Sequence, residues 1–227
     1  MSVSNRVKEA ILGTWLEPIQ QWGIESVLDR TIIAANHQYS IKTVFPAKSK
    51  IFRALLECEY DDVSVVFIGQ DPYHDGKATG ICFANDTPDE PRDLSPSLRV
   101  LKEEWEEDSP TQAFDPSLLT WAHQGILMLN TALTVEQGEP KSHSDIWKNW
   151  TSVFLSKLSK EKPDLLYVMF GKKAQEWKSH ITHGHTLAVV HPAAEVYSNG
   201  AARFFGSKPF SKVNQQLVKL ERPIIVW

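Results

Sequence analysis

The chain contains four short apolar runs that lack the alternation of polar and apolar positions expected of a strand with one solvated face. Uninterrupted runs of this length are typical of strands that are covered on both faces, as in a parallel sheet. The predicted strands cover residues 63–68, 125–129, 165–170 and 186–190.

Stretches with helical spacing precede and separate these runs. The predicted helices cover residues 5–16, 48–58, 97–107, 146–158 and 172–178. Because strands and helices alternate, the sequence predicts an α/β fold with a central, mostly parallel four-stranded sheet flanked by helices on both faces. A length of 227 residues with 42% hydrophobic content suits a single domain over residues 1–227.

Polar residues follow each predicted strand. Asp71 comes soon after the first run, Asn130 directly after the second, Lys172 after the third and His191 after the fourth. In open α/β sheets, ligands bind beyond the carboxyl ends of the strands. We therefore expect an acid, an amide, a basic turn and an imidazole to face one cleft.

Composition limits the classes of function. A net charge of −4 argues against a general nucleic-acid coat, although a local basic rim around a cleft stays compatible with it. The two cysteines, Cys58 and Cys82, form neither a metal-ligand spacing nor a disulfide framework, which favours a reducing compartment. No apolar run approaches the ~20 residues of a membrane span. We expect a cytoplasmic protein, with the nucleus or a virus-infected cell as further intracellular locations.

One string after the first run carries a specific resemblance. Asp-Pro after a strand commonly marks a turn and by itself indicates no function. Residues 69–74, however, read GQDPYH, which resembles the water-activating motif of the uracil-DNA glycosylases. The segments that resemble further motifs of that family, in the same order, are 82–84, 95–98, 127–131, 142–143, 170–171, 190–192 and 204–207. The resemblance spans roughly residue 45 to the end of the chain.

The resemblance implies hydrolysis of the N-glycosidic bond of deoxyuridine in DNA by base flipping, without cofactor or metal. Positive charge grows on the sugar as such a bond breaks, and a carboxylate can stabilise it and orient water. Asp71 matches that residue. His191 matches a neutral imidazole that donates a hydrogen bond to O2 of the leaving uracil, an interaction worth roughly 3–4 kcal/mol.

Recognition of the base requires a side chain that has both a hydrogen-bond donor and an acceptor. An amide satisfies O4 and N3 of uracil together, and Asn130 matches the family's amide. Cytosine reverses the pattern at these atoms and would leave buried groups unpaired. By resemblance, Tyr73 is the wall that excludes the thymine methyl, Phe83 stacks on the base, and Gln70 contributes backbone contacts. Taken singly, such aromatic residues are more often ordinary core.

DNA contacts are assigned to small residues that suit phosphate oxygens, namely Pro96, Ser97, Gly206 and Ser207, which resemble the family's strand-compressing loops. Ser97 also begins a predicted helix, a favourable position for an anion. Lys172, Lys208 and Lys212 form a candidate basic rim, although isolated lysines are more often solvated surface.

The stretch after the histidine departs from the family pattern. The family continues as HPSPLS, with a leucine that enters the DNA stack, whereas residues 191–195 read HPAAE. Glu195 aligns with the leucine, and a carboxylate is a poor wedge between bases. We assign the DNA contact here to Ala193, Val196 and Tyr197, with Val196 or Tyr197 as the wedge or with a weak wedge. We expect impaired extrusion from duplex DNA, because unstacking a base costs about a few kcal/mol.

Other functions were weighed against this one. A zinc nucleobase deaminase requires H-x-E and P-C-x-x-C, and the sequence has neither. The histidines at 180, 183 and 185 lack partner ligands for a metal. A DNA-binding or replication-accessory module on a glycosylase scaffold with weak activity is the alternative, but a pure binder has no need of Asp71, Asn130 and His191 together. A glycosylase with a broader base range is disfavoured by Tyr73 and Asn130.

The expected partner is uracil-containing DNA, single- or double-stranded, and a proteinaceous glycosylase inhibitor is a candidate second partner. Nothing in the sequence indicates a membrane partner or an oligomer, so a monomer is expected.

Overall fold

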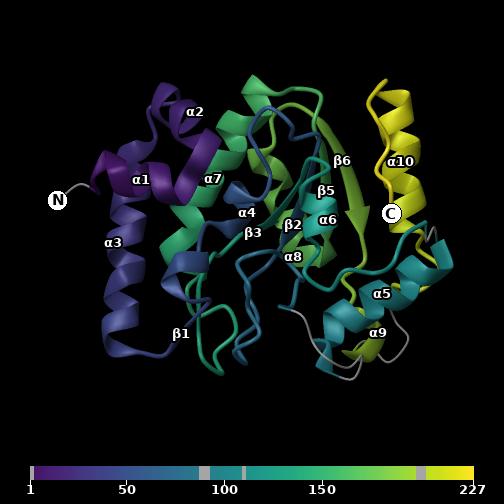
Figure 1. The fold of residues 1–227 in the computed structure, drawn as a ribbon, viewed down its shortest axis with the longest axis horizontal. Helices are drawn as coiled ribbons and strands as arrows, with labels where there is room; N and C mark the ends of the chain where they lie inside the picture. The colour runs from purple at the N-terminus through teal and green to yellow at the C-terminus, as the bar shows by residue number, and fades with distance from the viewer. Residues whose placement is uncertain (1–2, 87–92, 109–110, 198–202) are drawn as a thin grey trace.

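The structure, a computed structural model, describes residues 3–86, 93–108, 111–197 and 203–227 (Figure 1). Its α-helices are α1 (Asn5–Leu12), α2 (Leu16–Gln21), α3 (Glu25–Ile41), α4 (Arg53–Leu56), α5 (Pro96–Asp108), α6 (Leu119–Ala122), α7 (Ser144–Glu161), α8 (Gly171–Gln175), α9 (Ala194–Tyr197) and α10 (Pro209–Lys219). Short 3₁₀ helices are η1 (Gly13–Trp15), η2 (Lys48–Lys50) and η4 (Glu176–His180). The strands are β1 (Val44–Phe45), β2 (Val65–Gly69), β3 (Ile126–Asn130), β4 (Val135–Glu136), β5 (Leu166–Phe170) and β6 (His185–Val189).

The main sheet has the strand order β3-β2-β5-β6, and every neighbouring pair is parallel. This confirms the predicted four-stranded sheet, whose strands were located from the apolar runs to within two residues at each end. The first two strands were also placed one or two residues too early. β1 and β4 form a separate antiparallel pair that the sequence did not predict.

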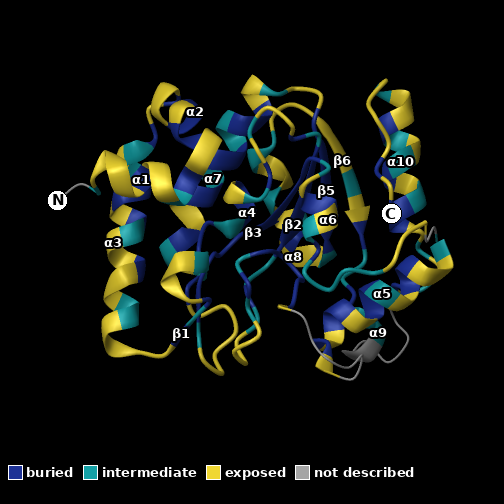
Figure 2. Ribbon diagram, viewed as in Figure 1, coloured by how far each residue is buried: buried dark blue, intermediate teal, exposed yellow. Residues whose placement is uncertain are grey.

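Alternate residues of β2, β3 and β5 enter two different hydrophobic clusters, one on each face of the sheet. On β2, Val66 and Ile68 pack with α1, α2, α3 and α7, whereas Val65 and Phe67 pack with α5, α6 and α10. Figure 1 shows these helix groups on opposite sides of the sheet, and Figure 2 shows the central strands as buried. Both faces of these three strands are therefore covered, which explains the absence of polar alternation in their sequences. β6 lies at an edge of the sheet and is mostly exposed, so the prediction of cover on both faces is wrong for this strand.

Two substantial helices escaped prediction, α3 and α10. Of the four side chains that α3 buries, Asp29 and Thr31 are polar, so its apolar stripe is weak. Buried Lys8 on α1 forms ion pairs with Asp29 and Glu25, which couples α3 to α1 through charge rather than hydrophobic pattern. Within the described part of the chain, no helix is long and apolar enough to cross a membrane.

Because the four strands are parallel, their carboxyl ends lie at one edge of the sheet. That edge carries Gly69 at the end of β2, Asn130 at the end of β3, Gly171 after β5 and His191 just after β6. Residues distant in the sequence thus meet at one place, as predicted for this class of sheet.

Candidate active site

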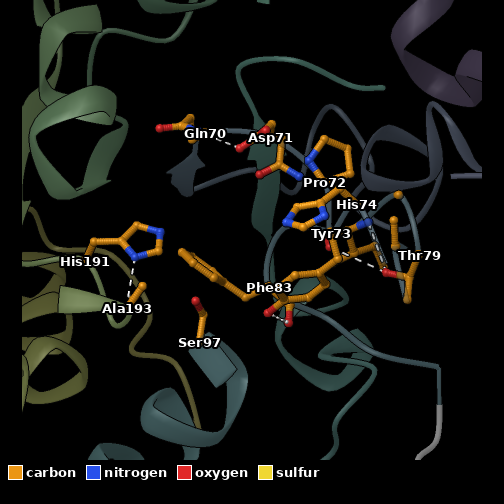
Figure 3. A pocket seen from close by; sticks show the side chains of 14 residues that line it. Gln70, Asp71, Pro72, Tyr73, His74, Thr79, Phe83, Ser97, His191 and Ala193 are labelled. Carbon is orange, nitrogen blue, oxygen red and sulfur yellow. Dashed lines mark hydrogen bonds between the residues drawn. The ribbon is translucent and has the colours of Figure 1, made fainter. Parts of the chain in front are cut away.

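A cavity of about 330 Å³ opens at the carboxyl edge of the sheet (Figure 3). It is lined by all six residues assigned from the sequence to catalysis and base binding, which are Gln70, Asp71, Tyr73, Phe83, Asn130 and His191. Its volume lies near the lower end of the range for small-molecule pockets, about 300–1,000 Å³. The segments after three separate strands therefore contribute polar groups to one compact site.

Asn130 enters the cavity because its neighbour on β2 has no side chain. Gly69 is the parallel-sheet partner of Asn130, and a Cβ atom on Gly69 would lie 2.5 Å from the Asn130 Oδ1 atom. Asn130 itself is buried. No hydrogen bond within the described residues uses its side-chain amide, so the donor and the acceptor both remain for a ligand.

Hydrogen bonds hold both carboxylate oxygens of Asp71. The Nε2 atom of Gln70 donates to Oδ1 and the backbone N–H of Lys141 donates to Oδ2, each over 2.7 Å. Lys141 has a φ of 69°, a left-handed conformation that is uncommon for a residue with a side chain. Each oxygen keeps a further lone pair, so the carboxylate can also accept from a water molecule in the cavity.

The imidazole of His191 is held in one tautomer. The N–H of Ala193 donates to Nδ1 over 3.0 Å, so Nδ1 is an acceptor and the neutral ring carries its proton on Nε2. Burial lowers the pKa of His191, and the charge of Asp71 opposes this with a smaller effect. Gly171, with a φ of 82°, allows close packing, since a Cβ there would lie 2.7 Å from the His191 Cβ.

The two aromatic residues of the site are tied together. The Tyr73 hydroxyl donates to the carbonyl oxygen of Phe83 over 2.9 Å. Phe83 has a φ of 66°, and its ring contacts the edge of Phe170 with centroids 5.0 Å apart. Its centroid is 5.6 Å from that of His191. Strained backbone of this kind clusters at ligand sites, where surrounding contacts maintain it.

Comparison with known proteins agrees with this geometry. The family model described as the uracil DNA glycosylase superfamily matches residues 57–218. The uracil-DNA glycosylase of Lysinibacillus sphaericus is 38% identical over 199 residues, covering 84% of this chain and 85% of that protein. The chain belongs to the uracil DNA glycosylase superfamily.

Further relatives extend over more of the chain. The uracil-DNA glycosylase of Chlamydia abortus is 36% identical over 220 residues, which cover 94% of this chain and 93% of that protein. The crystal structure of the mimivirus uracil-DNA glycosylase superposes with a TM-score of 0.79 at 20% identity, covering all of this chain and 90% of that one. A mimivirus UNG variant in complex with UGI gives a TM-score of 0.83 at 19% identity. The fold of the superfamily is therefore retained over the whole chain.

The residues assigned to DNA contact divide into three groups. Ser97 and Ala193 line the cavity, and Pro96 is exposed beside Ser97 at the start of α5. Val196 and Tyr197 belong to α9, and their side chains lie outside the described part of the structure.

Gly206 and Ser207 are not among the residues that line the cavity. The Gly206 N–H already donates to the buried Glu104 carboxylate over 2.7 Å, so it is not free to bind a phosphate. The sequence assigned this segment from its small residues, and the acceptor on α5 could not be seen in that pattern. The assignment of these residues to DNA contact stays a prediction, and the structure offers it no free amide at Gly206.

Three contributors to the site were assigned no role from the sequence, although Gly69 and Gly171 lie in the motif-like segments 69–74 and 170–171. Gly69 and Gly171 act through the side chains they lack, and Lys141 acts through its backbone N–H. Gly69 and Gly171 adjoin the polar residues that were recognised at the strand ends, so that position was the available signal. Nothing in the side chain of Lys141 indicates its bond to Asp71. Among the described residues, no group of three or more His, Cys, Asp or Glu side chains is arranged to hold a metal ion.

Proposed function

We propose that the protein is a uracil-DNA glycosylase that hydrolyses the N-glycosidic bond of deoxyuridine in DNA and leaves an abasic site. The observation that carries the proposal is the meeting of a carboxylate, an amide and an imidazole, Asp71, Asn130 and His191, around one cavity of about 330 Å³. Family membership and relatives at 36–38% identity that bear this activity in their names support it.

Recognition of uracil rests on Asn130, Phe83 and Tyr73. The side-chain amide of Asn130 donates to O4 and accepts from N3, while the ring of Phe83 stacks on the flat base. Tyr73, held through its hydroxyl by the Phe83 carbonyl, closes the space beside C5. The base contacts expected of the Gln70 backbone stay a prediction, and the residue also helps to order the site. Its carbonyl accepts from Thr131 Oγ1 and from the Ala132 N–H, and its side chain orients Asp71.

Bond cleavage uses charge placement rather than proton donation to the base. The electron pair of the N-glycosidic bond leaves with uracil, and the Nε2–H of His191 stabilises the negative charge that develops on O2, at roughly 3–4 kcal/mol. Asp71 stabilises the positive charge on the sugar and orients the water that adds to C1′. The proton lost by that water passes to Asp71 or to solvent, and uracil leaves as its anion. No cofactor or metal enters these steps.

The DNA strand enters past Ser97 and Ala193, which flank the cavity mouth. Ser97 lies in the first turn of α5, and the N-terminal end of a helix favours a phosphate oxygen. Pro96, Val196 and Tyr197 extend this contact along the strand. We propose that the protein acts as a monomer within the cell. By analogy with the mimivirus UNG variant in complex with UGI, an inhibitor protein is a candidate partner.

The proposal is tested by incubating the protein with a uracil-containing oligonucleotide and then with alkali, which breaks DNA at abasic sites. We expect cleavage at uracil only. Asp71→Asn should lower the single-turnover rate by orders of magnitude while DNA affinity stays within about twofold, because the amide cannot stabilise the cationic sugar. Asp75→Asn is the matched control, since Asp75 is an exposed carboxylate in the same loop. DNA retention without any cleavage by the native protein would instead support a DNA-binding module.

A further inference from the structure

Glu195, which aligns with the family's inserting leucine, is turned toward the protein. Its Oε2 atom accepts the N–H of Phe204 over 2.7 Å and the N–H of Phe205 over 3.2 Å. Its Oε1 atom lies 3.8 Å from Nε of Arg203, and only 15% of the side chain is exposed. A carboxylate that satisfies two backbone donors is committed to the protein, because its removal would leave those donors without this partner.

Glu195 is rigidly connected to the catalytic imidazole. The N–H of Ala194 donates to the carbonyl of His191 over 2.9 Å, and the N–H of Glu195 donates to that of Pro192 over 3.1 Å. Together with the bond from Ala193 to the ring, these contacts make residues 191–195 one tight turn. A displacement of the Glu195 side chain would therefore also displace His191.

The segment that Glu195 grips is itself fixed to the core. Phe204 is fully buried in the cluster that includes Phe83 and Phe170. Two residues further on, the carboxylate of Glu104 on α5 accepts the N–H groups of Gly206 and Lys208, each over 2.7 Å. The segment 203–208 is thus a firm support, and Glu195 is one attachment of the His191 turn to it.

We propose that Glu195 is a positioning residue that holds the His191 turn, and hence the Nε2–H donor, in register with the base in the cavity. The proposal rests on the proposed function, because it assigns Glu195 to the same reaction. An oxyanion donor acts only at the correct distance, and a misplacement of about 1 Å can cost about 10²-fold in rate. Glu195 makes no contact with the reacting atoms in this role.

The experiment compares three variants on a single-stranded uracil oligonucleotide. Glu195→Gln keeps an oxygen that can accept both N–H groups, so we expect kcat within about twofold of native. Glu195→Ala removes the acceptor and Glu195→Asp withdraws it by one methylene. We expect both to lower kcat by about ten- to a hundredfold, with KM within about twofold, because donor placement and not DNA affinity is lost.

Asp108→Ala is the matched structural control. Asp108 accepts the N–H of Ser211 over 2.8 Å, the same kind of bond to the same region, but it does not touch the His191 turn. It should lower thermal stability comparably and leave kcat unchanged when assayed well below the unfolding temperature.

Three results would overturn the role of Glu195. They are native kcat in both Glu195→Ala and Glu195→Asp, a loss in Glu195→Gln as large as in Glu195→Ala, or an equal loss in Asp108→Ala. Should Glu195→Ala not fold, the Asp and Gln variants decide the question. Absence of uracil cleavage by the native protein would contradict the proposed function itself, which is a separate outcome.

Discussion

The backbone N–H of Ala193 donates a hydrogen bond to Nδ1 of His191 over 3.0 Å. An acceptor at Nδ1 fixes the proton of the neutral ring on Nε2, which lies on the side able to face a ligand. Protonation of the ring would place a second hydrogen between Nδ1 and this N–H, so the contact opposes the imidazolium. Burial acts in the same direction by lowering the pKa of His191.

This relationship predicts the pH dependence of the reaction. A lowered pKa means that His191 stays neutral from alkaline pH down past its ordinary pKa of about 6.5. We expect the His191 contribution to kcat to be constant from pH 8 to about 6.5 and to be lost only as pH falls through the lowered pKa. The measurement is kcat against pH on single-stranded DNA, with imidazole ¹⁵N shifts to identify the tautomer.

The exposed His123, which precedes the amino end of β3, supplies a control, because it pairs with Glu57 and does not line the cavity. His123→Gln should leave the pH profile unchanged. A rate that increases as pH falls from 8 to 6 would show that the imidazolium is the active form and would contradict the neutral donor.

Gly69 makes a second prediction possible. A Cβ at this position would lie 2.2 Å from the Cys82 sulfur and 2.5 Å from Oδ1 of Asn130. Gly69→Ala must therefore displace the Asn130 amide that is proposed to recognise uracil. We expect kcat/KM on uracil DNA to fall by at least about tenfold while the protein still unfolds cooperatively. Adding Cys82→Ala relieves the contact with sulfur alone and should not restore activity. Full recovery in the double variant would show that Asn130 is not the affected group.

Two substitutions distinguish the role of the Tyr73 hydroxyl, which bonds to Phe83, from the role of the Tyr73 ring. Tyr73→Phe removes only the hydroxyl that donates to the Phe83 carbonyl and keeps the ring beside the base. We expect it still to reject thymine. Tyr73→Ala removes the wall and should produce measurable cleavage at thymine, because the C5 methyl then has space. Continued rejection of thymine by Tyr73→Ala would assign the exclusion to another residue.

The sequence was sufficient for the parts of the molecule that depend on side-chain type. Uninterrupted apolar runs identified β2, β3 and β5, which are buried, and also the largely exposed edge strand β6. Polar residues at the ends of these runs identified Asp71, Asn130 and His191. A parallel sheet brings such positions to one edge whatever the intervening loops do. The same logic could not find α3, whose apolar stripe is weak because Asp29 and Thr31 are two of its four buried side chains.

The sequence could not predict which backbone groups contribute to the site, or which backbone groups are already bonded to residues distant in the chain. The N–H of Lys141 orients Asp71, but every residue except proline carries an N–H, so the side chain gives no signal. Gly206 and Ser207 have the small side chains of a phosphate-binding loop. The Gly206 N–H nevertheless donates a hydrogen bond to Glu104, which lies 102 positions earlier in the chain. Only the contacts in the folded structure show which N–H groups are already bonded and which group each of them binds.

Glu195 leads to the last prediction, which concerns strand preference. Its carboxylate is bonded to the N–H groups of Phe204 and Phe205, so it does not fill the gap that a flipped base leaves in a duplex. Extruding a base from a duplex costs about a few kcal/mol, and the cost is lower for a mismatched base. We therefore expect the fastest cleavage for uracil in single-stranded DNA, slower cleavage for uracil opposite guanine and the slowest for uracil opposite adenine. Initial rates on one labelled oligonucleotide, alone and annealed to each complement, give this order directly. Val196→Ala and Tyr197→Ala test the two wedge candidates, because loss of a wedge should slow duplex cleavage and leave the single-strand rate unchanged. Duplex cleavage as fast as single-strand cleavage in the native protein would mean that another side chain does the work of the missing leucine.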